Sequence, residues 1–254
     1  MTKRDLLSEI EKNYQSFPRI DDFHIDKGRI INLLNDLMSL FFPRHFPSEK
    51  SGEELLDDVT RNLKEEIAKV DVDYEAKTEA LLEKLPIIQN RLYKDTEAIY
   101  DGDPSAKTFT EIILSFPGFL AVFAYRVAHE LYDLNVPIIP RIIAEYAHEK
   151  TGIDLNPGAK IGEYFCIDHG TGIVVGETAT VGDHVRMYHG VTLGVRKFNK
   201  GENGVLLKGG KRHPDVGNNV TIYANATILG GETQIADHSS ISTGSLITES
   251  NNER

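Results

Sequence analysis

The chain carries two successive patterns of hydrophobic and polar positions. Up to about residue 150, apolar residues recur at helical spacing, most clearly in runs over residues 33–41 and 55–67. This spacing is typical of amphipathic helices that bury one face. A turn at residues 101–104 separates a predicted helix over 87–100 from a longer apolar helix that follows it. The sequence therefore predicts an all-helical domain over residues 1–151.

Prolines and caps mark the predicted helix borders. Pro43, Pro47 and Pro86 are each expected to start or stop a helix, because proline lacks an amide donor and clashes with the preceding turn. Ser51 and Glu54 match a capping box, in which two side chains satisfy free backbone amides at the start of a helix. The last helix is expected to end near Gly152.

Beyond residue 152 the hydrophobic period becomes six. Glycines crowd the gaps, as expected where short strands meet at tight corners. Such a repeat indicates a parallel β-helix, in which about a dozen hexapeptides form roughly four coils. The predicted fold class is thus α+β, with a β-helix over residues 152–254 interrupted by an inserted loop at 195–215. The positions that carry the period are Leu155, Ile161, Ile167, Ile173, Ala179, Val185 and Val191, then Val216, Ile222 and Ile228, and finally Ile235, Ile241 and Ile247. Because the flat faces and open edges of such coils need cover, we expect a homotrimer.

Composition narrows the class of protein. The 28 basic and 39 acidic residues give a net charge of −11, which disfavours nucleic acid and anionic lipid as partners. The one cysteine, Cys166, cannot form an internal disulfide, and the N-terminus has no apolar signal core, so we expect a reducing compartment, the cytoplasm. The most apolar stretch, residues 116–125, is far shorter than the roughly 20 residues of a membrane-spanning helix. No membrane segment is expected.

A histidine and two acids at predicted coil corners are candidates for catalysis. Asp168 and His169 follow a strand, and Asp154 lies 15 residues before His169, close to one coil of roughly 18 residues. A neutral imidazole can act as a general base at neutral pH, and a carboxylate can orient it. The alternative is a solvated corner histidine without function.

The inserted loop, Cys166 and Asp103 could each have either a functional or a purely structural role. Residues 195–214 of the loop include six basic residues and one acid, Glu202, so this segment is either a ligand-binding excursion or a mobile solvated loop. Its basic residues are Arg196, Lys197, Lys200, Lys208, Lys211 and Arg212. Cys166 is interpreted as a buried small residue rather than a nucleophile. Asp103, before Pro104, needs no role beyond forming a turn.

Six motifs occur in a fixed order along the chain. They are Tyr125-Arg126-Val127-Ala128-His129, the segment Thr151 to Ala159, Ile167-Asp168-His169-Gly170-Thr171-Gly172, Gly190-Val191-Thr192-Leu193-Gly194, Lys211-Arg212-His213-Pro214, and Ala226-Thr227-Ile228-Leu229-Gly230. Together they resemble the bacterial serine O-acetyltransferases over residues 80–248. Hexapeptide repeats alone are shared by many acyltransferases, whereas this combination is specific.

The resemblance implies a left-handed β-helix and transfer of acetyl from acetyl-CoA to L-serine, giving O-acetylserine for cysteine biosynthesis. It implies no tightly bound cofactor and no metal; acetyl-CoA is a co-substrate. By motif position, His169 becomes the general base and Asp154 its orienting carboxylate. The implied serine-site residues are Asp103, Asp168, Arg212 and His213, and the implied contacts to the thioester arm of acetyl-CoA are Gly194 and Ala224. The resemblance also implies inhibition by cysteine and assembly as a homotrimer or a dimer of trimers.

Some features depart from the family or favour a rival. The chain closes with Asn251 to Arg254, without the further coil segment and terminal isoleucine of some relatives, so no complex with O-acetylserine sulfhydrylase is predicted. The loop is longer than in most relatives. One rival is a metal-dependent β-helix lyase resembling γ-class carbonic anhydrase, with His148, His184 and His189 as ligands. Other rivals are a hexapeptide acyltransferase with another small acceptor and a non-catalytic scaffold.

Overall fold

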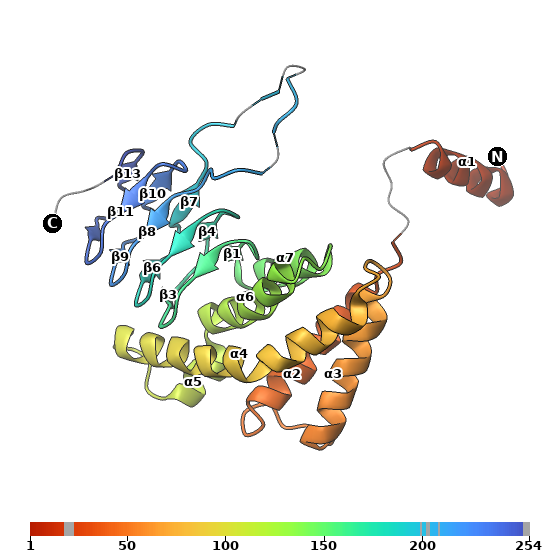
Figure 1. Cartoon of the computed structure of the whole chain (residues 1–254), viewed down its shortest axis with the longest axis horizontal. Coiled ribbons are helices and arrows are strands. Elements are labelled where there is room, and N and C mark those ends of the chain that lie inside the picture. Colours follow the sequence, from red (N-terminus) through yellow and green to blue (C-terminus); the bar gives the residue numbers. More distant parts are fainter. Residues whose placement is uncertain (18–22, 199, 202–203, 208, 251–254) are drawn as a thin grey trace.

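A computed structural model describes residues 1–17, 23–198, 200–201, 204–207 and 209–250. Helices occupy the N-terminal part and a prism of short strands follows them (Figure 1). The helices are α1 (Lys3–Gln15), α2 (Lys27–Phe41), α3 (Gly52–Ile67), α4 (Tyr74–Gly102), α5 (Phe109–Ser115), α6 (Pro117–Asp133) and α7 (Ile139–Thr151). The strands are β1 (Asp154–Leu155), β2 (Lys160–Ile161), β3 (Cys166–Asp168), β4 (Val174–Val175), β5 (Thr180–Val181), β6 (Arg186–Tyr188), β7 (Thr192–Gly194), β8 (Asp215–Val216), β9 (Thr221–Ile222), β10 (Thr227–Leu229), β11 (Gln234–Ile235), β12 (Ser240–Ile241) and β13 (Leu246–Ile247).

Most predicted helix borders are confirmed. The capping box at the start of α3 forms as expected, with Ser51 and Glu54 each accepting a backbone amide of the other. Gly152 ends α7 in the left-handed region at φ +70°, which glycine adopts without a steric penalty. The apolar faces of α2 and α3 are buried together, whereas Leu56 is exposed.

Two predicted borders are wrong. Pro86 lies inside α4, where the flanking Leu81, Leu85 and Ile88 are buried and their packing outweighs the missing amide hydrogen bond. The predicted long apolar helix is split, because Pro117 forces Phe116 into an extended conformation. The axes of α5 and α6 consequently meet at 73°.

The prism has three parallel sheets, as the six-residue period predicts. One holds β1, β4, β7, β10 and β13, the second β2, β5, β8 and β11, and the third β3, β6, β9 and β12. We call them sheets A, B and C. The chain visits them in the order A, B, C, so that the strands form four full coils and begin a fifth. The inward-facing strand residues, such as Ile167, Met187 and Ile222, form the buried aliphatic column.

The coils are unequal in length, which the uniform period conceals. In sheet A, Asp154 pairs with Val174, Val174 with Thr192, Thr192 with Thr227 and Thr227 with Leu246, so successive coils take 20, 18, 35 and 19 residues. The expectation of about 18 residues for the first coil is therefore wrong. Its two additional residues lie in the corner between β3 and β4, while the 35-residue coil contains the inserted loop.

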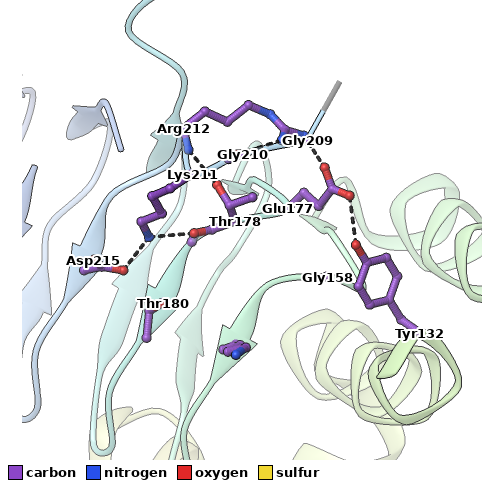
Figure 2. A pocket seen from close by; sticks show the side chains of 12 residues that line it. Tyr132, Gly158, Glu177, Thr178, Thr180, Gly209, Gly210, Lys211, Arg212 and Asp215 are labelled. Carbon is purple, nitrogen blue, oxygen red and sulfur yellow. Dashed lines mark hydrogen bonds and ion pairs between the residues drawn. The ribbon is translucent and has the colours of Figure 1, made fainter. Parts of the chain in front are cut away.

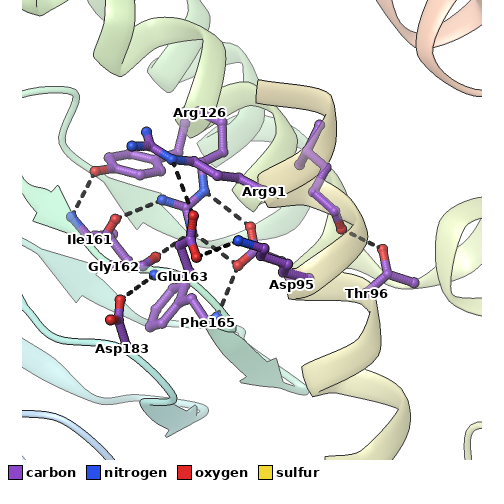
Figure 3. Close-up of polar contacts among 12 residues, drawn as sticks. Arg91, Asp95, Thr96, Arg126, Ile161, Gly162, Glu163, Phe165 and Asp183 are labelled. Carbon is purple, nitrogen blue, oxygen red and sulfur yellow. Dashed lines mark hydrogen bonds and ion pairs between the residues drawn. The ribbon is translucent and has the colours of Figure 1, made fainter. Parts of the chain in front are cut away.

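A buried ion pair fixes the helices to the prism. Arg126 on α6 donates to both carboxylate oxygens of Asp95 on α4, at 3.0 Å each (Figure 3). The same guanidinium donates to the carbonyls of Ile161 and Gly162 in the first coil, and Asp95 accepts the amide of Phe165. The pair thereby determines how α4 and α6 lie against the coil that carries His169.

Helix α1 stands apart from the rest of the fold (Figure 1). It has no buried residue, and its apolar side chains Leu6, Leu7 and Ile10 are exposed. Among the described helices, no single one is long and apolar enough to span a membrane, although the bent pair α5 and α6 passes a test of length and composition.

Candidate active site

His169 occupies the enlarged corner between β3 and β4. Its backbone is left-handed, at φ +58°, and Gly170 and Gly172 follow at φ +89° and +81°. Left-handed residues with a Cβ recur at other corners of this prism, such as Tyr164, His184 and Asn219, so this conformation belongs to the turn geometry. The side chain is 74% exposed. The imidazole therefore points away from the aliphatic column and is accessible to a substrate.

Two carboxylates lie beside this imidazole. The Nε2 atom of His169 is 3.6 Å from Oδ1 of Asp168, whose side chain is largely buried. Asp103, at the C-terminal end of α4, is also close. Its pKa is lowered, mainly by a hydrogen bond with Ser105 and to a smaller extent by the charge of His169. The structure thus brings together three predicted site residues from two distant segments.

A second imidazole belongs to the same corner. His189 lies one coil after His169, with its ring centroid 5.8 Å from that of His169. Its Nδ1 atom is buried and has no hydrogen-bond partner in the described part of the chain. Sequence reasoning considered His189 only as a metal ligand. The structure places His189 one coil after His169 because the first coil has 20 residues, a length that the six-residue period does not reveal.

Asp154 begins the first coil near the same edge. The amide of Gly172 donates to the carbonyl of Gly152 at 2.7 Å, so the His169 corner folds back onto the segment that precedes Asp154. Burial raises the pKa of Asp154, and the charges of His148 and Arg141 oppose this rise. No hydrogen bond or ion pair joins Asp154 to His169 among the described residues, so the orienting role of Asp154 stays a prediction.

Arg212 and His213 are held by Thr178, at the corner between sheets A and B. The hydroxyl of Thr178 accepts the backbone amides of both residues, at 2.9 and 3.1 Å. The amide of Thr178 donates to Nδ1 of His213 at 3.1 Å, which places the proton of the neutral ring on Nε2. Burial and the charge of Arg212 lower the pKa of His213 to about 4, so this ring is neutral at pH 7.

Glu177 and Tyr132 position the Arg212 side chain, and sequence reasoning missed both. Figure 2 shows Glu177 between them: one carboxylate oxygen pairs with the guanidinium and the other accepts the Tyr132 hydroxyl at 2.9 Å. Gly158 permits this approach, because a Cβ there would lie 2.8 Å from Cγ of Glu177 and 2.9 Å from Cζ of Tyr132. These residues border a cavity of about 630 Å³ that Lys160 and Lys211 also line.

The predicted site residues therefore form two groups within one chain. Asp103, Asp168 and His169 lie at the edge between sheets C and A, whereas Arg212 and His213 lie at the edge between sheets A and B. We call these the histidine edge and the arginine edge.

The two positions implied for the thioester arm are divided in the same way. Ala224 follows His189 one coil later on the histidine edge, and Gly194 ends β7 at the arginine edge. No described contact tests a role for either.

The remaining candidates are accounted for by other contacts. His148 pairs with Glu145, and His184 stacks on Tyr164 at 4.4 Å, so these histidines do not converge with His189 on a common point in the described chain. Cys166 is buried, and this burial raises the pKa of its thiol to about 12, as the interpretation of a packed residue predicts. Glu202, Lys208 and residues 251–254 lie outside the described residues.

Comparisons with known proteins identify close relatives. Residues 46–124 match the family described as serine acetyltransferase, N-terminal. A plasmid-encoded serine acetyltransferase of Synechococcus elongatus is 41% identical over 224 residues, covering 78% of this chain and 70% of the relative. A serine acetyltransferase of Staphylococcus aureus is 39% identical over 164 residues, covering 65% and 72%.

Solved structures agree over nearly the whole chain. Serine acetyltransferase 1 of Entamoeba histolytica, in complex with L-cysteine, matches with a TM-score of 0.74 and 32% identity, covering 94% of this chain and 95% of that one. The Neisseria gonorrhoeae enzyme in complex with serine matches with a TM-score of 0.60 and 28% identity, covering 86% and 90%. The predicted helical region followed by a left-handed β-helix is confirmed.

Proposed function

The chain belongs to the serine acetyltransferase family, and we propose that it transfers acetyl from acetyl-CoA to serine at the edge that carries His169. Its activity is that of a serine O-acetyltransferase, which forms O-acetylserine. We place the site at this edge because the imidazole of His169 is exposed there. The enlarged coil corner holds it beside Asp103 and Asp168.

His169 acts as the base in this proposal. Its imidazole removes the proton of the serine hydroxyl while the oxygen attacks the thioester carbonyl. The tetrahedral intermediate then expels the CoA thiolate, which takes the proton back from the imidazolium. The ring of His189 lies edge-on to that of His169 at the same corner, where it helps to position the base. Asp154 orients the base when the substrates close the site.

Ionic groups hold the two charged ends of free serine. Asp103 and Asp168 take the ammonium, and Arg212 takes the carboxylate in two-point fashion. His213 adds its Nε2 hydrogen to the carboxylate, since Thr178 occupies Nδ1. Gly194 and Ala224 contact the thioester arm. Cysteine differs from serine by one sulfur and competes for the same groups, in keeping with the L-cysteine complex of the Entamoeba relative.

A homotrimer would bring the two groups of site residues together, one group from each of two neighbouring copies. The histidine edge and the arginine edge are different edges of a three-sided prism. In a ring of three copies about an axis parallel to the prism, the arginine edge of each copy meets the histidine edge of the next. Each complete site then takes its base from one copy and its carboxylate-binding residues from another. The single buried Cys166 suits a reducing compartment, and we place the protein in the cytoplasm.

Release of thiol from acetyl-CoA tests this function. Serine is expected to give a much higher kcat/KM than threonine, homoserine or sugar acceptors, and cysteine is expected to raise the apparent KM for serine. Replacing the exposed side chain in His169→Ala should lower kcat by about 10²–10⁴-fold without loss of fold. Near-normal turnover in that variant, or preference for another acceptor, would contradict the proposal.

A further inference from the structure

Arg186 connects a strand of the prism to the end of a helix. It lies on β6 and pairs in register with Cys166 and Thr221, whereas the next residue, Met187, is buried in the aliphatic column. Because side chains alternate along a strand, the guanidinium lies on the outer face of sheet C. There its Nη1 atom donates a 2.9 Å hydrogen bond to the carbonyl of Gly102, the last residue of α4. The prism thereby holds the residue that precedes Asp103.

This contact fixes the peptide group that leads into Asp103. The carbonyl of Gly102 and the amide of Asp103 belong to one planar peptide unit. Arg186 binds the oxygen of this unit, and its N–H donates to the carbonyl of Ile99 at 2.9 Å. With both polar atoms held, the backbone at Asp103 cannot turn freely. The Asp103 carboxylate, which also accepts the amide of Ser105 at 2.8 Å, is therefore kept beside the histidine edge.

Gly102 lets the guanidinium approach this closely. A Cβ at position 102 would lie 2.5 Å from Nη2 and 2.8 Å from Cζ of Arg186. Gly102 is buried and ends α4, where alanine is usually favoured over glycine by about 1 kcal/mol. A glycine at this position is explained by the space that Arg186 occupies. The two residues are matched to each other.

Arg186 also supplies a positive charge that the end of α4 lacks. The last turn of α4 contains no basic residue, and Asp101 and Asp103 place acids at the end where the helix dipole is negative. Glu97, Asp101 and Arg186 border one cavity of about 350 Å³. Because a guanidinium stays charged at neutral pH, Arg186 offsets the repulsion at this helix end.

We propose that Arg186 is a positioning residue for serine binding: by holding the peptide group between Gly102 and Asp103, it keeps the Asp103 carboxylate where the ammonium of serine binds. The proposal rests on the serine site proposed above. Arg186 does not contact serine in this account and acts through Asp103. Its loss should therefore weaken serine binding and leave the chemical step largely intact.

Steady-state kinetics of Arg186→Met test this role. We expect the KM for serine to rise about tenfold, because the bond from a charged donor is lost, while the KM for acetyl-CoA and the kcat at saturating serine change by less than about twofold. Arg186→Lys keeps a charge and a donor and should recover part of the affinity for serine. The matched control is Arg91→Met, which removes a half-buried guanidinium that joins α4 to Glu130 on α6 and should leave the KM for serine unchanged.

A second variant disturbs the same contact from the helix side. In Gly102→Ala the added methyl group displaces the flexible end of the Arg186 side chain, so the fold should persist while the KM for serine rises as in Arg186→Met. Thermal unfolding shows whether each variant is folded, and Gly102→Ala with Arg186→Lys carries the test if Arg186→Met is not.

A double-mutant cycle with Asp103→Asn separates positioning from a general structural role. If Arg186 acts through Asp103, the variant carrying both Arg186→Met and Asp103→Asn should have the serine KM of Asp103→Asn within about twofold. Multiplied effects in the double variant, or an unchanged serine KM in folded Arg186→Met, would overturn the inference. A raised serine KM in Asp103→Asn beside an unchanged one in Arg186→Met would leave the proposed serine site standing and refute only the role of Arg186.

Discussion

The hydroxyl of Tyr132 on α6 donates a 2.9 Å hydrogen bond to Glu177 in the prism, and the other oxygen of that carboxylate pairs with Arg212. A helix is thereby connected to the side chain proposed to bind the serine carboxylate. The ion pair with Arg212 keeps the pKa of Glu177 below its usual range. Glu177 therefore remains charged at neutral pH and holds the guanidinium in one orientation.

Removing the charge of Glu177 should weaken serine binding more than catalysis. The Glu177→Gln variant loses a charge-assisted interaction of about 1.5–3 kcal/mol, so we expect KM for serine to rise about tenfold or more. The KM for acetyl-CoA and the kcat at saturating serine should change little. Tyr132→Phe should shift KM in the same direction by less. Steady-state kinetics with both substrates varied would measure this.

Glu65→Gln is the matched control for Glu177→Gln, because Glu65 on α3 pairs with Arg29 on α2 at the exposed surface of the helical part. Its kinetics should equal those of the unaltered enzyme. If the KM for serine is unchanged in Glu177→Gln, Arg212 does not need the charge of Glu177 to bind serine, and the prediction is wrong.

Breaking the buried ion pair should cost much more stability than breaking an exposed one. Asp95→Ala leaves the guanidinium of Arg126 buried without its carboxylate, and we expect a loss of about 3–5 kcal/mol in the free energy of unfolding. The exposed pair of Arg29 and Glu65 provides the comparison, since Glu65→Ala should cost no more than about 1 kcal/mol. Urea unfolding at equal protein concentration would distinguish them; similar losses would contradict this account.

The free energy of unfolding should decrease as the pH is lowered from 7, because the folded chain keeps His213 neutral. Its pKa in the folded chain is lowered to about 4, whereas an unfolded histidine titrates near 6.5. The stabilisation is therefore complete above about pH 6.5 and is lost as the pH falls towards 4. Between pH 7 and pH 5 the loss amounts to about 2 kcal/mol. The control is His213→Asn, which keeps an acceptor for Thr178 but does not titrate. Between pH 7 and pH 5, the free energy of unfolding should decrease more in the unaltered chain than in this variant. Equal decreases in the two chains would contradict the prediction.

Local rules recovered most of the architecture. The capping box at Ser51, the C-terminal glycine at Gly152 and the six-residue period each rest on backbone geometry, and each is confirmed. Pro86 was misjudged because tertiary packing on both sides of a long helix outweighed one missing hydrogen bond.

The site was harder to predict, because it depends on how residues of successive coils pair, and the six-residue spacing of apolar residues does not reveal this pairing. Ile167 and Ile173 keep a six-residue interval although the first belongs to a strand and the second to a corner, and this coincidence hid the enlarged corner that presents His169. Glu177 and Tyr132 lie 45 residues apart and meet only because Gly158 leaves room for them. No sequence period encodes such a contact.

Mixing two impaired variants should restore part of the activity if the site is shared between copies. His169→Ala damages the histidine edge and Arg212→Gln damages the arginine edge. In a mixed ring of three copies, one junction joins an intact histidine edge to an intact arginine edge. Random assembly of equal amounts therefore yields about a quarter of the sites intact.

The control mixture combines His169→Ala with Asp168→Asn, which damage the same edge. Every histidine edge in that mixture carries one lesion, so no junction is intact and activity should not exceed that of the separate variants. Both mixtures are made by co-expression and assayed for thiol release at serine concentrations below KM, where the Arg212 lesion is most severe. Recovery near a quarter in the first mixture and none in the second assigns the base and the carboxylate-binding arginine to different copies, whereas no recovery in the first places the whole site within one chain.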